Sequence, residues 1–144
     1  MTKNKVKEQT ALQKKEKSER ELALAILLEV EKGEKSHLVL RSVLEKYQYL
    51  DKQERAFLTR LTEGTIERTL ELDYIINQYS KTKVQKMKPV IRNILRMAVY
   101  QIKYMDNVPD SAACNEAVKL AQKKGFYSLK GFVNGVMRNV ARKK

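Results

Sequence analysis

The sequence is poor in the residues that most often carry catalytic or metal chemistry. Its 144 residues include one cysteine, Cys114, one histidine, His37, and no tryptophan. A lone cysteine cannot form an internal disulfide, and no cysteine and histidine spacing resembles a zinc site. No second group that titrates near neutrality stands beside His37 to form a nucleophile and base pair. We therefore predict no catalytic residue and no metal site in this chain.

Proline, glycine and long apolar runs are also scarce, with two prolines and five glycines. The longest apolar stretch, residues 22–28, is far shorter than the roughly 20 residues of a membrane span, and residues 1–18 lack a secretory apolar segment. No glycine-rich phosphate-binding motif is present. We expect a cytoplasmic protein that does not enter a membrane and that has no cofactor site of its own.

Basic residues, in contrast, are abundant and unevenly distributed. The chain has 30 Lys and Arg against 17 Asp and Glu, a net charge of +13, and the length of one domain. Residues 1–20 carry seven basic and three acidic residues (+4), residues 21–80 eight and eleven (−3), and residues 81–144 fifteen and three (+12). This distribution favours a phosphate-rich partner over a merely solubilising role, which is the alternative interpretation.

Apolar residues recur at helical spacing, so we predict an all-α fold of about seven helices in one bundle. Residues 1–17 contain too few apolar residues to order alone and are predicted to be a flexible basic arm, followed by a helical domain over residues 18–144. Gly33 and Gly125 are expected to end helices. The predicted helix starts are Ser18 in a capping box with Glu21, Ser36, Asp51 paired with Glu54, Thr69 as a cap, Pro89, Asp110 or Ser111 as a cap, and about Ser128.

A few residues could have special roles but have simpler interpretations. Gly131 and Gly135 lie one turn apart in the last predicted helix, where each glycine is unfavourable, so we expect a neighbouring helix, or alternatively a ligand, to approach closely there. Asp73 is interpreted as a partner of a helix dipole. Asn115 and Glu116 are expected to bond to a neighbouring helix end rather than to act in catalysis.

Two groups of cations form the predicted RNA-binding site. Phosphate contacts by lysine and arginine would supply most of the affinity, and the two groups would form a continuous track if they share one face. At most one or two of the seven tyrosines are expected to stack on unpaired bases, with the rest at core edges. The first group is Lys14, Lys15, Lys17 and Arg20, and the second includes Lys123, Lys124, Arg138 and Arg142.

Several sequence runs, specific in combination, extend over nearly the whole chain after the predicted arm. They are residues 92–101 (RNILRMAVYQ), 108–121 (VPDSAACNEAVKLA) and 131–140 (GFVNGVMRNV), with further matches over residues 18–30 and 55–76. In these runs the sequence resembles the NusB family. The resemblance implies an all-helical RNA-binding domain made of two small packed bundles.

The family has two branches, and residues 63–68 (EGTIER), 100–101 (YQ) and 137–142 (MRNVAR) are more similar to one of them. That branch is the N-terminal domain of Sun/Fmu-type enzymes, which methylate carbon 5 of a cytosine in small-subunit ribosomal RNA. The resemblance implies a noncatalytic domain that helps position ribosomal RNA for a methyltransferase domain. The methyltransferase domain, which would bind S-adenosylmethionine and carry catalytic cysteines, is absent from these residues, and Cys114 matches none of its positions.

Two alternatives remain open. The other branch implies a transcription antitermination factor that binds single-stranded RNA together with ribosomal protein S10. A third possibility is an interaction module whose helical faces bind a protein and whose charge only maintains solubility.

Overall fold

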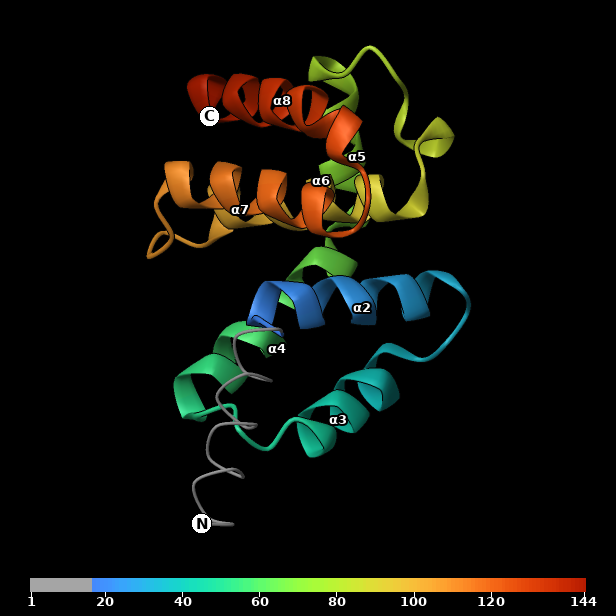
Figure 1. Ribbon diagram of the computed structural model, residues 1–144, viewed down its shortest axis with the longest axis vertical. Coiled ribbons are helices and arrows are strands. Elements are labelled where there is room, and N and C mark those ends of the chain that lie inside the picture. The colour runs from blue at the N-terminus through green and yellow to red at the C-terminus, as the bar shows by residue number, and fades with distance from the viewer. Residues whose placement is uncertain (1–16) are drawn as a thin grey trace. The chain divides into compact units, whose positions relative to one another are not determined.

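The computed structural model describes residues 17–144, which form seven α-helices and two short 3₁₀ turns, with no β-strand among them (Figure 1). This confirms the predicted all-α fold of about seven helices. Lys14, Lys15 and nearly all of the predicted arm lie outside the described residues. The helices are α2 (Glu19–Glu31), α3 (Ser36–Lys46), α4 (Lys52–Glu67), α5 (Thr69–Tyr79), α6 (Pro89–Tyr104), α7 (Asp110–Lys123) and α8 (Lys130–Lys143), and the 3₁₀ turns are η1 (Val84–Lys86) and η2 (Tyr127–Leu129).

Local sequence signals set several of the helix ends. At the start of α2 the Ser18 hydroxyl accepts a hydrogen bond from the Glu21 N–H at 3.2 Å. At the start of α4 the Asp51 carboxylate accepts from the Glu54 N–H at 2.8 Å, and the Glu54 carboxylate accepts from the Asp51 N–H at 3.0 Å. These side chains satisfy backbone donors that have no partner inside the helix. The Ser18 half of the predicted capping box and the reciprocal pair of Asp51 and Glu54 are therefore confirmed.

Two other predicted caps are wrong. The N-cap residue of α7 is Pro109, and no side chain caps this helix end. Asp110 is already helical, and its carboxylate instead accepts a hydrogen bond from Lys144 Nζ at 2.9 Å. Thr69 is the first residue of α5, and its hydroxyl donates backward to the carbonyl oxygens of Thr65 and Ile66, each at 3.0 Å.

The chain divides into two compact units, residues 1–60 and 61–144. The interpretation of the helical pattern as one bundle is therefore wrong, and the two bundles implied by the family resemblance are observed. In the first unit α2 packs against α3 (Figure 1). Buried residues of this unit are Leu22, Leu24, Ile26, Leu27, Leu40, Leu50 and Leu58. Helix α4 begins in the first unit and ends in the second.

The second unit is built around α6, which packs against α5, α7 and α8. Its apolar positions recur at helical spacing and are buried, as expected for the predicted central helix. They are Ile91, Ile94, Leu95, Met97, Ala98, Val99 and Ile102. Small residues of α7, Ala113, Ala117 and Ala121, are also buried, and they allow close contact between helices.

Close backbone approach occurs at a different glycine from those predicted. A Cβ added at Gly131 or Gly135 would meet no atom within 4 Å, so the expected close neighbour at these two positions is wrong. A Cβ added at Gly64 in α4, however, would collide with the ring and hydroxyl of Tyr100 in α6. Residue 64 must therefore lack a side chain if Tyr100 is to keep its buried position.

Across residues 17–144, no helix has the length and apolar character needed to cross a bilayer. Within the same residues, no group of three or more His, Cys, Asp and Glu side chains is placed to hold a metal ion.

Candidate nucleic-acid interface

The second unit carries a run of exposed lysines between α5 and α6. We call residues 80–88 the lysine segment. Its apolar residues Val84 and Met87 are buried, with 0% and 7% of their surface exposed. Its four lysines are all exposed: Lys81, Lys83, Lys86 and Lys88. The buried residues hold the segment to the unit, and the lysines face solvent between them.

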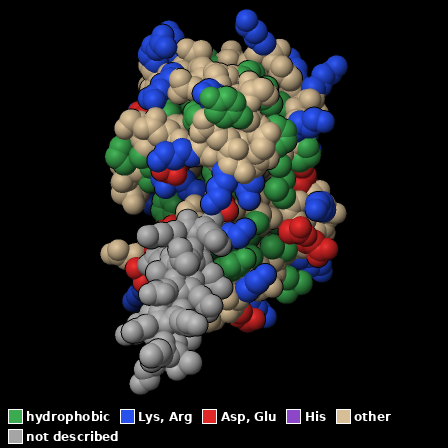
Figure 2. All heavy atoms as spheres, viewed as in Figure 1, with side chains coloured by type: hydrophobic (Ala, Val, Ile, Leu, Met, Phe, Trp, Pro, Cys, Tyr) green, Lys and Arg blue, Asp and Glu red, His purple; other side chains and the backbone are tan. Residues whose placement is uncertain are grey.

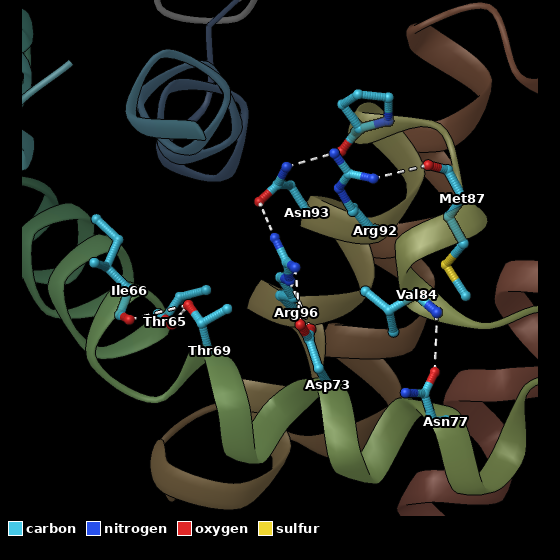
Figure 3. A network of polar contacts seen from close by, with 11 residues as sticks. Thr65, Ile66, Thr69, Asp73, Asn77, Val84, Met87, Arg92, Asn93 and Arg96 are labelled. Atoms are coloured by element: carbon cyan, nitrogen blue, oxygen red, sulfur yellow. Dashed lines mark hydrogen bonds and ion pairs between the residues drawn. The ribbon is translucent and has the colours of Figure 1, made fainter. Parts of the chain in front are cut away.

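Polar contacts fix the backbone of this segment from both neighbouring helices (Figure 3). The side-chain oxygen of Asn77, in α5, accepts a hydrogen bond from the Val84 N–H at 2.9 Å. Arg92, in α6, donates from Nη1 to the Met87 carbonyl at 3.1 Å. An ordered backbone reduces the conformational entropy that would be lost when the lysines bind a ligand.

The two helices that flank the segment are joined by an ion pair (Figure 3). Arg96 of α6 donates from Nε and Nη2 to the two carboxylate oxygens of Asp73 in α5, at 2.7 and 2.9 Å. Both side chains are largely buried, with 14% and 15% exposed. Asp73 is therefore the partner of a guanidinium rather than of a helix dipole, and the interpretation of Asp73 from sequence is wrong. The pair fixes the spacing of α5 and α6 beneath the lysine segment.

The four lysines are exposed and stand apart from carboxylates. Within the part of the chain that the structure describes, none of them makes an ion pair, whereas Lys17, Lys119 and Lys144 each pair with a carboxylate. Figure 2 shows Lys and Arg side chains projecting at the upper right, over the region where Figure 1 shows this segment. Four uncompensated cations within eight residues create a local positive potential that attracts a polyanion.

An apolar pocket of about 250 Å³ adjoins the segment. Apolar side chains from the segment, α6, η2 and α8 line it, and two of the four lysines stand with them. The lining residues are Thr82, Lys86, Met87, Lys88, Ile91, Leu129 and Phe132. Apolar walls suit the face of an unpaired base, and nearby ammonium groups suit its phosphate, so the pocket has the chemistry of a site for a single-stranded nucleotide.

The first predicted group of cations lies in the first unit, where the structure describes Lys17 and Arg20. Lys17 Nζ lies 3.8 Å from the carboxylate of Glu21. The guanidinium of Arg20 lies over the ring of Phe57, 5.2 Å from its centroid. Both cations are half-buried and engaged in contacts within the protein.

The second predicted group lies in the second unit, and the four members named above are exposed: Lys123, Lys124, Arg138 and Arg142. Arg138 donates to the side-chain oxygens of Asn115 in α7, at 3.0 Å, and of Asn134, at 3.2 Å. Asn115 thus bonds to a side chain of the neighbouring helix α8, where a bond to the end of a neighbouring helix was expected. Because both acceptors are neutral amides, these bonds position the guanidinium without neutralising it.

The pocket brings the beginning of α8 next to the lysine segment, because Phe132 lines it together with Lys86 and Lys88. The four lysines of the segment are not among the RNA-binding residues predicted from the sequence. The signal for them was available: four lysines in eight residues directly before Pro89, a basic cluster of the kind that binds nucleic acid.

In a second polar cluster on this unit, the positive and negative charges offset each other. The Tyr104 hydroxyl donates a hydrogen bond to Glu71, and the Arg68 guanidinium lies over the Tyr104 ring, 4.3 Å from its centroid. The bond from Tyr104 lowers the pKa of the Glu71 carboxyl, and the same bond raises the pKa of the Tyr104 phenol. Since Arg68 also pairs with Glu71 at 3.2 Å, this cluster has less charge to offer a ligand than the lysine segment has.

Comparison with known proteins gives a consistent family assignment. The sequence profile of the NusB family matches residues 17–142. The chain is 38% identical over 129 residues to the probable ribosomal RNA small subunit methyltransferase B of Bacillus subtilis strain 168, a match that covers 89% of this chain and 28% of the relative. It is 30% identical over 139 residues to the transcription antitermination protein NusB of Thermodesulfovibrio yellowstonii, with 89% of this chain and 92% of that protein covered.

Solved structures agree with this assignment. NusB of T. maritima superposes with a TM-score of 0.77 at 26% identity, covering 86% of this chain and 88% of that one. A chain in the crystal structure of antitermination factors NusB and NusE in complex with double-stranded RNA superposes with a TM-score of 0.79, covering 88% of this chain and 95% of that one. At 21% identity, the second comparison supports the fold alone. The chain spans under a third of the length of the methyltransferase relatives that it matches.

Proposed function

Because the chain belongs to the NusB family, we propose that it is an RNA-binding domain that holds single-stranded ribosomal RNA through phosphate contacts. The observation that carries this proposal is the lysine segment, with four exposed and uncompensated lysines on an anchored backbone beside an apolar pocket. Counterion release on phosphate contact would supply most of the affinity, and unpaired bases would enter the pocket.

The RNA-binding domain would help position ribosomal RNA for a cytosine-C5 methyltransferase domain. The 38% identity to the Bacillus subtilis methyltransferase supports this assignment. S-adenosylmethionine would bind that methyltransferase domain. In this role the present chain supplies cations that orient the RNA, and a cytoplasmic location fits the role.

The second candidate function is transcription antitermination together with ribosomal protein S10. The similarity to Thermodesulfovibrio yellowstonii NusB over 92% of that protein favours it. Affinity for a single-stranded ribosomal RNA fragment, measured with and without added S10, separates the two candidates. A positioning domain binds equally well alone, whereas an antitermination factor binds substantially tighter with S10 present.

RNA binding itself is tested by measuring the affinity for a single-stranded RNA across salt concentrations. We expect log Kd to rise linearly with log salt concentration. Changing Lys81, Lys83, Lys86 and Lys88 together to Gln should lower the magnitude of the slope by about 3, because each phosphate contact on a single strand contributes about 0.7.

A matched control removes four exposed lysines of the first unit, Lys32, Lys35, Lys46 and Lys52, by the same change to Gln. Both variants lose the same net charge, so an effect of total charge alone would alter the two slopes equally. We expect the control variant to keep most of the wild-type slope. Equal loss in both variants, or a salt-independent affinity of the wild type, would overturn the assignment of the lysine segment.

A further inference from the structure

Two of the seven tyrosine rings are prominently exposed. Tyr74 is 68% exposed and Tyr127 is 62% exposed. Other tyrosines are engaged within the protein: Tyr100 is buried, Tyr104 donates to Glu71, and the Tyr49 hydroxyl donates to the Lys17 carbonyl at 2.8 Å. An exposed aromatic ring can stack on a base of any identity, provided that the surrounding charge permits a polyanion to approach.

The charge around the two exposed rings differs. Residues 123–130, which contain Tyr127, include three lysines and no carboxylate. Tyr74 lies in α5, whose residues include Glu71 and Asp73 and no lysine or arginine. A phosphate chain would be attracted to the surroundings of Tyr127, whereas the carboxylates of α5 are paired with Arg68 and Arg96 and the helix has no cation of its own to attract one.

Contacts within the second unit hold Tyr127 in place. Lys130 Nζ donates to the Tyr127 hydroxyl at 2.7 Å and lies 4.0 Å from the centroid of the ring. Tyr127 begins η2, and the same turn supplies Leu129 to the wall of the pocket that Lys86 and Lys88 line. The ring is therefore carried by the same short turn as part of the apolar pocket, with an ammonium group over one face and the other face left for a base.

We infer that Tyr127 is a stacking platform for an unpaired base of the bound RNA, with Lys130 placed to contact the adjoining phosphate. This inference rests on the proposed RNA binding and adds a residue that contacts a base rather than the backbone. A base stacked on Tyr127 would be held whatever its identity, because stacking depends on the π face that all bases share.

The test measures binding of the full chain to a fluorescently labelled decamer of adenosine at low salt. Tyr127→Ala should weaken this binding about tenfold to a hundredfold, since removal of a stacking ring has effects of that size. Tyr127→Phe, which keeps the ring and loses the hydroxyl, should stay within about twofold of wild type. Tyr74→Ala is the matched control and should bind as wild type does.

A decamer of abasic phosphodiester units separates stacking from charge. Wild type and Tyr127→Ala should bind this backbone equally, because it has no base to stack. Circular dichroism of each variant verifies that the helices are retained, as expected for exposed positions.

The outcomes for the inference and for the proposed function are distinct. If Tyr127→Ala binds the adenosine decamer as tightly as wild type, or if Tyr127→Phe loses as much as Tyr127→Ala, the stacking platform is refuted while RNA binding stands. If Tyr127→Ala weakens binding of the abasic decamer to the same extent, the tyrosine acts without a base and the inference fails. If the wild type binds neither decamer, both the proposed RNA binding and the stacking platform are refuted.

Discussion

Gly64 and Tyr100 meet in the second unit, and neither can change alone without disturbing the other. A side chain at residue 64 would collide with the ring and hydroxyl of Tyr100, which is only 7% exposed and has little room to move. We expect Gly64→Ala to lower the free energy of unfolding by about 2 kcal/mol, as overpacking in a core does. Chemical denaturation measures the change. Combining it with Tyr100→Leu should recover part of the loss, and a simple sum of the two losses would contradict the collision.

Thr65, the next residue, carries a buried hydroxyl that has no hydrogen-bond partner among the described residues. An unsatisfied buried polar group is destabilising by about 1–3 kcal/mol relative to a satisfied one. Thr65→Val replaces the hydroxyl with a methyl group of similar size, and we expect it to raise the free energy of unfolding by about 1 kcal/mol. Thr62, also buried in α4, engages its surroundings, so Thr62→Val should not stabilise the protein. Thermal unfolding of both variants compares them directly.

Tyr127 provides a spectroscopic probe of its own surroundings. The hydrogen bond from Lys130 lowers the pKa of the Tyr127 phenol, because the ammonium group favours the phenolate. We expect Lys130→Gln to raise this pKa toward the ordinary value, observed by following the tyrosine ring carbons by NMR from pH 8 to 12. Lys119→Gln, which removes an exposed lysine of α7, should leave the Tyr127 titration unchanged. An unchanged pKa in Lys130→Gln would show that the bond does not persist in solution.

Contacts between residues close in sequence could be predicted, and contacts between distant residues could not. The cap at Ser18 and the pair of Asp51 and Glu54 each join residues three apart, so the spacing alone reveals them. Asp73 and Arg96 are 23 residues apart, and the collision at Gly64 involves Tyr100 in another helix. Such pairs depend on how helices pack, which composition and periodicity do not encode.

Among the elements, α8 contains two glycines whose role can be tested. Gly131 and Gly135 are helical, and a Cβ at either position meets no atom within 4 Å. Alanine is favoured over glycine in a helix interior by about 1 kcal/mol. We expect Gly135→Ala to raise the free energy of unfolding by about that amount, and Gly131→Ala, in the first turn of α8, to raise it by less, both measured by urea denaturation. If either alanine is destabilising, the exposed face of α8 has a neighbour in solution after all.

The order and spacing of helices followed from periodicity, proline and glycine, but the starts of α5 and α7 did not. Pro89 begins α6 and Gly125 follows α7, as predicted, because both residues restrict the backbone whatever surrounds them. Thr69 and Asp110 have residue types that suit a cap, yet each hydrogen-bonds elsewhere. A polar side chain can satisfy several partners, and tertiary structure decides among them.

The molecule as a whole combines a strong excess of positive charge with a division into two units. The charge surplus was read correctly from the sequence, because net charge needs no coordinates. The positions of these cations were predicted only in part. Lys123, Lys124, Arg138 and Arg142 are exposed in the second unit, as an RNA-binding role requires, but the lysine segment was not predicted. What marks the segment is the burial of Val84 and Met87 between its lysines, a property that emerges only when α5 and α6 are in place.

Because the net charge is +13, added salt should stabilise the free protein and weaken its complex with RNA. Salt screens repulsion among the cations, so the melting temperature of the free protein should rise by about 4 °C between 20 and 300 mM salt. A bound single-stranded RNA relieves the same repulsion and binds only the folded state, so it should raise the melting temperature most at low salt and progressively less as salt displaces it. Differential scanning fluorimetry with and without RNA records both melting-temperature curves, which should converge at high salt.

The variant in which all four lysines of the lysine segment are changed to Gln separates the two effects. Its melting temperature should rise less with salt in the free protein and should be raised less by RNA, since one set of cations produces both effects. A variant that lost only the RNA effect, with its own salt dependence intact, would show that these lysines recognise RNA without contributing to the repulsion.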